Sequence, residues 1–98
     1  MDNKKIKIPE PLKKYVIQDI DKRLIKKNSI AKGGQGTVWL AVDDQNKEYA
    51  IKEIFVDLKN PIRQIKRYLL ECASLMRAQH PFIITFCGMT DKYPFQIV

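Results

Sequence analysis

Residues 30–42 have the sequence IAKGGQGTVWLAV, in which a glycine-rich stretch is followed directly by a run of β-forming residues. The preceding residues, Ile25 to Ala31, also have the composition of a strand. Glycines between two secondary elements let backbone amides approach a phosphate closely, because no Cβ stands in the way and unusual dihedral angles cost little. The order strand, glycine turn, strand predicts a β-hairpin that can cover an anion.

Two other glycine-rich phosphate loops are disfavoured by this context. A Walker loop needs Gly-Lys-Ser/Thr at the start of a helix, and a dinucleotide-binding fingerprint also runs from a strand into a helix. Gly36 is instead followed by a strand, which argues against both. An ordinary glycine-rich hairpin without a ligand remains the alternative.

Three further segments have the composition of strands. Residues 43–47 are polar turn formers, and Glu48 to Phe55 after them is rich in β-formers. Phe82 to Cys87 and Pro94 to Val98 predict two more strands, joined through residues 88–93. The sequence therefore predicts an α+β fold with a five-stranded antiparallel sheet.

One main helix is expected between the third and fourth strands. Asn60 can cap free amides and Pro61 tolerates the first helical position, so the helix should begin here and run to about Ala78, before His80-Pro81. Its apolar residues recur at three- and four-residue steps, which predicts one buried stripe that packs on the sheet. The stripe comprises Ile62, Ile65, Leu69, Cys72, Ala73 and Met76.

Composition predicts one compact unit. The chain has 98 residues, 45% of them hydrophobic, and a formal charge of +7. Residues 1–28 hold nine Lys or Arg and four Asp or Glu, so the basic character is mostly N-terminal. We interpret this segment as a solvated, partly flexible tail; attraction to nucleic acid or to an anionic membrane is the alternative.

Cysteine usage and hydropathy favour a soluble, intracellular and cytoplasmic protein. Cys72 and Cys87 lack metal-ligand spacing, and the chain does not open with a signal peptide. No run approaches the roughly 20 apolar residues of a membrane-spanning helix. We expect no membrane span, no metal site and no specific nucleic acid partner.

A lysine and a glutamate are candidate site residues. In Tyr49-Ala50-Ile51-Lys52, strand alternation puts Lys52 on the same face as Ala50, among apolar neighbours where an ammonium needs an anion. Glu71 lies 19 residues later on the predicted helix, at the edge of the apolar stripe. The alternatives are that Lys52 extends to solvent and that Glu71 pairs with Arg67 on the surface, for about 0.3 kcal/mol.

These motifs together resemble the N-terminal lobe of eukaryotic-type protein kinases. The kinase loop GxGxxGxV is matched at Gly33, Gly36 and Val38, while Ala31 departs at the first glycine and Gln35 replaces the usual aromatic residue at the tip. The kinase Val-Ala-Ile-Lys strand is matched by the segment ending in Lys52. The expected glutamate follows at Glu71, with Leu75 one turn later and His80-Pro81 beyond.

The resemblance implies a division of the chain and a set of ATP-binding residues. Residues 24–98 would be a partial kinase domain that stops before the hinge, and residues 1–23 a basic N-terminal segment. Side chains of three strands would sandwich the adenine, the loop from Ala31 to Thr37 would cover the phosphates, and Glu71 would hold Lys52 in an ion pair. The implied ATP-binding residues are Ile30, Ala31, Lys32, Gly33, Gly34, Gln35, Gly36, Thr37, Val38, Ala50 and Lys52.

The resemblance also implies what a full-length form would do. It would use ATP to phosphorylate Ser, Thr or Tyr of a protein, with Mg²⁺ held mainly by residues outside this chain. The catalytic-loop Asp and Asn and the Asp-Phe-Gly motif do not occur here, so we expect no catalytic residue and an inactive chain. The alternatives are a pseudokinase-like docking module for a C-terminal lobe or partner protein, and a small nucleic-acid-binding β-domain.

Overall fold

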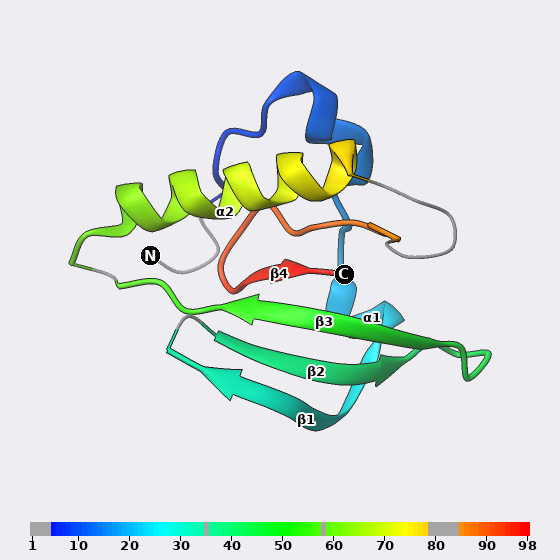
Figure 1. Cartoon of the computed structure of the whole chain (residues 1–98). Coiled ribbons are helices and arrows are strands. Elements are labelled where there is room, and N and C mark those ends of the chain that lie inside the picture. Colours follow the sequence, from blue (N-terminus) through cyan, green and yellow to red (C-terminus); the bar gives the residue numbers. More distant parts are fainter. Residues whose placement is uncertain (1–4, 35, 58, 79–84) are drawn as a thin grey trace.

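Four strands and one long helix make up most of the fold. The computed structural model describes residues 5–34, 36–57, 59–78 and 85–98. In these residues the strands form one antiparallel sheet in the order β1-β2-β3-β4, and helix α2 lies along one of its faces (Figure 1). The α+β class is confirmed. The elements are β1 (Ile25–Gly33), β2 (Gly36–Val42), β3 (Glu48–Ile54), α2 (Pro61–Arg77) and β4 (Phe95–Ile97).

The sheet of the described residues has four strands, so the prediction of five is wrong. The strand expected at residues 82–87 begins outside the described residues, as does the helix end expected at His80-Pro81, and residues 85–87 are not in a strand. Met89 forms only an isolated bridge with Ile97. Both backbone groups of Met89 bond instead to the N-terminal segment: its N–H donates to the Tyr15 carbonyl at 3.0 Å, and its carbonyl accepts from the Ile17 N–H at 2.7 Å.

The turn between β2 and β3 is organised by one aspartate. Asp43 Oδ1 accepts hydrogen bonds from the N–H groups of Gln45 and Lys47, each at 2.9 Å. The bond from the Lys47 N–H is the main reason that the pKa of the Asp43 carboxyl is lowered. Asn46 adopts a left-handed conformation, with φ of 64°, which asparagine tolerates better than most residues. The polar run therefore forms the turn that its composition predicts.

Helix α2 buries most of the stripe that its periodicity predicts, since Cys72 belongs to the core cluster and Ile65, Leu69, Ala73 and Met76 pack against it. Tyr68 and Cys72 are fully buried, whereas Ile62, expected in the stripe, is 66% exposed because the first turns of α2 extend beyond β4 (Figure 1). The expected cap is also absent: the Asn60 side chain makes no capping hydrogen bond. Instead the Gln64 side chain accepts a hydrogen bond from the N–H of Asp57, just before the helix.

The N-terminal segment contributes to hydrophobic clusters on both faces of the sheet. A 3₁₀ helix, η1 (Glu10–Tyr15), places Leu12 in the cluster that α2 forms with β4. A short helix, α1 (Ile20–Arg23), places Ile20 in the smaller cluster on the opposite face, against Ala41 and Ile51. Figure 1 shows η1 packed over α2 and α1 behind the sheet. The basic segment thus supplies apolar side chains to the core.

Candidate functional site

The strand register aligns three of the expected site residues in one row. Ala31 is the partner of Val38, and Val38 is the partner of Lys52, whose other neighbour is Ile97 of β4. Directly paired residues of an antiparallel sheet project from the same face. Because Ile97 belongs to the cluster that packs on α2, the row faces α2. Lys52 therefore projects toward the helix.

Lys52 and Glu71 are brought together across the space between sheet and helix. Lys52 Nζ lies 2.9 Å from Glu71 Oε2, and the two side chains are 38% and 35% exposed. Among the described residues, Glu71 forms no ion pair with Arg67, the other partner considered. An ion pair with this much exposure contributes at most about 1 kcal/mol to folding. The main consequence of the ion pair is to hold the Lys52 ammonium on the sheet face that also carries Ala31 and Val38.

The glycines of the hairpin play different parts. A Cβ on Gly36 would lie 2.0 Å from the backbone oxygen of Glu53, so only glycine fits where β2 meets β3. A Cβ on Gly33 or Gly34 would meet nothing within 4 Å, which leaves the end of the hairpin open. Gln35, expected at its tip, lies outside the described residues. The open backbone is the part that can approach a ligand.

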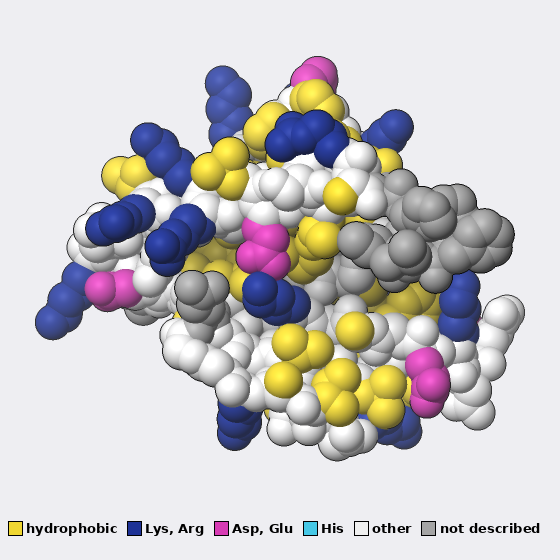
Figure 2. All heavy atoms as spheres, viewed as in Figure 1, with side chains coloured by type: hydrophobic (Ala, Val, Ile, Leu, Met, Phe, Trp, Pro, Cys, Tyr) yellow, Lys and Arg dark blue, Asp and Glu magenta, His cyan; other side chains and the backbone are white. Residues whose placement is uncertain are grey.

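The surface beside Lys52 is apolar and partly open. Val38 is partly buried and Ala50 is exposed, and both lie on the Lys52 face. Figure 2 shows hydrophobic side chains over the sheet, next to a basic and an acidic side chain that meet below α2. Ile30 is 58% exposed and lies at a register shift of β1, so it is not brought into the row. The other two expected loop residues are Lys32, which is exposed, and Thr37, which is buried.

A hollow of about 430 Å³ lies between the hairpin and α2, and Glu71 forms part of its wall. Arg67, on the same side of α2 one turn earlier, adds a guanidinium to this wall. Sequence reasoning considered Arg67 only as a surface partner of Glu71, although the same i, i+4 spacing places both on one side of the helix. The lining residues are Gly34, Ile54, Phe55, Gln64, Arg67, Tyr68 and Glu71.

No protein-family model and no curated protein matches the chain. The chemistry of the site is therefore argued from its geometry. Two cationic groups, the Lys52 ammonium and the Arg67 guanidinium, border Glu71 beside open glycine backbone and apolar strand surface. Such a combination suits a ligand with an anionic end and a flat apolar end.

A second lysine–glutamate pair offers an internal comparison. Lys26 Nζ lies 3.2 Å from Glu53 Oε2, and Trp39 donates to the other oxygen of Glu53 at 3.3 Å. Because Glu53 follows Lys52 in β3, this pair lies on the opposite face of the sheet. It packs against an aromatic ring, with Lys26 Nζ 5.6 Å from the centre of the Trp39 ring. The pair matches the Lys52–Glu71 pair in chemistry but lies on the other face of the sheet.

None of the described helices is sufficiently long and apolar to cross a bilayer. The described residues also contain no group of three or more His, Cys, Asp or Glu side chains arranged to hold a metal ion.

Proposed function

We propose that the hairpin, Lys52 and Glu71 form a nucleotide-binding site for ATP, in a lobe related to the N-terminal lobe of protein kinases. The observation that carries the proposal is the 2.9 Å pair between Lys52 and Glu71, next to the glycine hairpin and on the face shared with Ala31 and Val38. The resemblance in sequence predicts each of these residues in this order. Their arrangement supports the proposal.

Each group has a defined task in this proposal. The Lys52 ammonium contacts the α- and β-phosphates, and Glu71 orients it without removing it from solvent. Backbone N–H groups at Gly33 and Gly34 approach the phosphates, because the space above them is open. Val38 and Ala50 give the adenine ring an apolar surface.

The proposal for these 98 residues is nucleotide binding. Phosphoryl transfer to a protein also requires a catalytic Asp and Mg²⁺ ligands, which kinases carry in His-Arg-Asp and Asp-Phe-Gly sequences. Neither sequence occurs in the 98 residues. Phosphorylation of protein Ser, Thr or Tyr is therefore proposed only for a form that contains those sequences.

Calorimetric titration with Mg-ATP tests the proposal on matched variants. Lys52→Met removes the ammonium on the hairpin side, and Lys26→Met removes the one on the opposite face. We expect Lys52→Met to weaken ATP binding about tenfold or more, since a hydrogen bond to a charged group is worth about 1.5–3 kcal/mol. Lys26→Met should bind ATP like the native protein.

Two results would overturn the proposal. One is the absence of saturable ATP binding by the folded native protein at millimolar nucleotide. The other is an equal loss of binding in both lysine variants, which would indicate non-specific attraction to the basic surface.

A docking module is a second candidate, favoured by exposed apolar side chains on β1. Ile25 and Ile30 are 59% and 58% exposed, although strand isoleucines usually lie against a core. If this surface docks another protein or lobe, sedimentation velocity should show concentration-dependent self-association that the double variant Ile25→Thr/Ile30→Thr abolishes. A monomer at all concentrations that binds ATP would favour the first candidate alone.

A further inference from the structure

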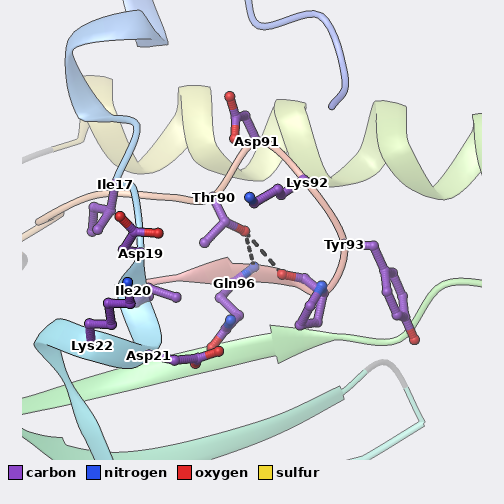
Figure 3. Close-up of a pocket in the computed structure, with 11 residues that line it drawn as sticks. Ile17, Asp19, Ile20, Asp21, Lys22, Thr90, Asp91, Lys92, Tyr93 and Gln96 are labelled. Carbon is purple, nitrogen blue, oxygen red and sulfur yellow. Dashed lines mark hydrogen bonds between the residues drawn. The ribbon is translucent and has the colours of Figure 1, made fainter. Parts of the chain in front are cut away.

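A second hollow, of about 260 Å³, lies on the other side of the sheet from Lys52. It is enclosed by the connection into α1, by α1 itself and by the loop that leads into β4 (Figure 3). It shares no lining residue with the hollow beside Glu71. The lining residues are Ile17, Asp19, Ile20, Asp21, Lys22, Thr90, Asp91, Lys92, Tyr93, Pro94 and Gln96.

Gln96 is the unusual residue of this hollow. It is only 2% exposed, and its side chain extends from β4 toward α1 in Figure 3. Its backbone groups are satisfied, since its N–H donates to Thr90 Oγ1 and its carbonyl accepts from the Tyr68 hydroxyl, each at 2.9 Å. The side-chain oxygen, Oε1, is buried and has no hydrogen-bond partner among the residues that the structure describes.

An unpaired buried amide oxygen costs about 1–3 kcal/mol, so it calls for a hydrogen-bond donor. The Thr90 hydroxyl, which lines the same hollow, already has its hydrogen engaged. Thr90 Oγ1 donates its hydrogen to the Pro94 carbonyl at 3.1 Å while it accepts from the Gln96 N–H. Since no donor of the described residues bonds to Oε1, a group that enters the hollow can supply one.

The charged groups around Gln96 indicate that the entering donor group carries a positive charge. Asp19, Asp21 and Asp91 line the hollow, and within the described residues none of their carboxylates forms a side-chain hydrogen bond or an ion pair. Two lysines, Lys22 and Lys92, also line it, so the carboxylates outnumber the ammonium groups. A negatively charged ligand would be repelled by these carboxylates and by the lone pairs of Oε1.

We propose that this hollow binds a guanidinium or primary ammonium group, with an N–H donated to Gln96 Oε1 and the positive charge toward Asp19 and Asp21. The volume lies just below the usual range for drug-sized ligands, about 300–1,000 Å³, and suits a group of side-chain size. A free small cation and an arginine or lysine side chain of a peptide carry the same chemistry. The site is independent of the nucleotide site, because it lies on the opposite face.

Nuclear magnetic resonance of the ¹⁵N-labelled chain tests the proposal with methylguanidinium as the probe. We expect saturable shifts of the Gln96 side-chain amide and of the Asp21 and Thr90 backbone amides. The neutral probe acetamide should cause about tenfold weaker effects, since it lacks the charge. N-acetylarginine methylamide distinguishes the sources: tighter binding than methylguanidinium supports a peptide side chain, and equal binding supports a free cation.

Variants of Gln96 and Lys52 distinguish binding in this hollow from binding at the proposed nucleotide site. Gln96→Met removes the acceptor while keeping the shape, and should abolish the saturable shifts of the Asp21 and Thr90 amides. Because Oε1 has no partner to lose, the variant should remain folded. Lys52→Met should bind the probe normally. If Gln96→Met does not fold, the exposed double variant Asp19→Asn/Asp21→Asn should weaken binding about tenfold.

Several outcomes would overturn the proposal. They are the absence of saturable shifts with methylguanidinium, equal responses to methylguanidinium and acetamide, or unchanged binding in folded Gln96→Met. Each would indicate that water alone satisfies Gln96.

Discussion

Tyr68 joins helix α2 to the strand and loop that it covers. Its side chain is 1% exposed, and its hydroxyl accepts from the Thr90 N–H at 3.0 Å and lies 2.7 Å and 2.9 Å from the carbonyl oxygens of Thr90 and Gln96. Burial raises the pKa of this phenol, so it remains a neutral donor at all ordinary pH values. One hydroxyl therefore satisfies backbone groups on both sides of a tight turn.

Replacing Tyr68 by Phe should lower the free energy of unfolding by about 1–3 kcal/mol, because it removes the hydroxyl that lies 2.7 Å from the buried Thr90 carbonyl, while the Thr90 N–H and the Gln96 carbonyl keep their mutual 3.0 Å bond. Urea unfolding followed by circular dichroism measures the change. Tyr49→Phe is a suitable control, since the Tyr49 hydroxyl donates to Asp43 at 3.2 Å in a solvated turn. A loss for Tyr68→Phe no greater than that for the control would contradict this role of the hydroxyl.

The two cysteines should differ sharply in reactivity. Cys72 is fully buried on α2, and burial raises the pKa of its thiol to about 12, whereas Cys87 is exposed. The thiolate is the reactive form, so at pH 8 Cys72 is both neutral and inaccessible. Iodoacetamide should therefore modify only Cys87 in the native protein and both cysteines in urea, as measured by peptide mass spectrometry. Rapid native labelling of Cys72 would show that α2 is not packed as described.

Among the elements, Gly36 and Gly33 of the hairpin should respond differently to substitution by alanine. Gly36→Ala forces a Cβ against the Glu53 backbone, 2.0 Å from its oxygen, and should lower the free energy of unfolding by about 2 kcal/mol. Gly33→Ala places its Cβ in open space and should change stability by less than about 0.5 kcal/mol. Thermal unfolding of the two variants makes the comparison. Equal effects would mean that β2 and β3 do not approach as closely as described.

Local chemistry was sufficient to predict most elements. The strands around the hairpin, the polar turn at 43–47 and the helix beginning at Pro61 agree with the structure to within a few residues. What the sequence missed depends on contacts between distant segments. Ile62 is exposed because the helix extends past β4, and no local signal shows where a neighbouring strand ends. Just after the predicted fifth strand, both backbone groups of Met89 bond to the N-terminal segment, a contact between distant segments that no local signal shows.

In the candidate site, too, local sequence predicts some features, whereas contacts between distant segments decide others. Strand alternation places Lys52 on its face, and a spacing rule from the family resemblance points to Glu71. Helical periodicity left two partners open for Glu71, because the rotation of α2 is set by which side chains it buries. The observed rotation buries Tyr68, which is absent from the predicted stripe, together with Cys72, and Glu71 meets Lys52.

At the scale of the whole molecule, the N-terminal segment belongs to the folded unit. Leu12 is 1% exposed and packs in the same cluster as Tyr68 and Phe95. Leu12→Ala should therefore lower the free energy of unfolding by about 2–5 kcal/mol, the usual cost of removing a buried leucine. Urea unfolding measures this, with the exposed Lys13→Ala as the control. A small, equal effect of both variants would show that η1 does not pack on the core.

Nuclear magnetic resonance of the ¹⁵N-labelled native chain, titrated with Mg-ATP, tests most directly whether the face carrying Lys52 binds a nucleotide. We expect saturable shifts of the backbone amide signals of Gly33, Gly34, Val38, Ala50 and Lys52, with little change around Gln96 on the opposite face. Saturable shifts confined to the basic N-terminal segment, or no shifts at millimolar nucleotide, would contradict this expectation.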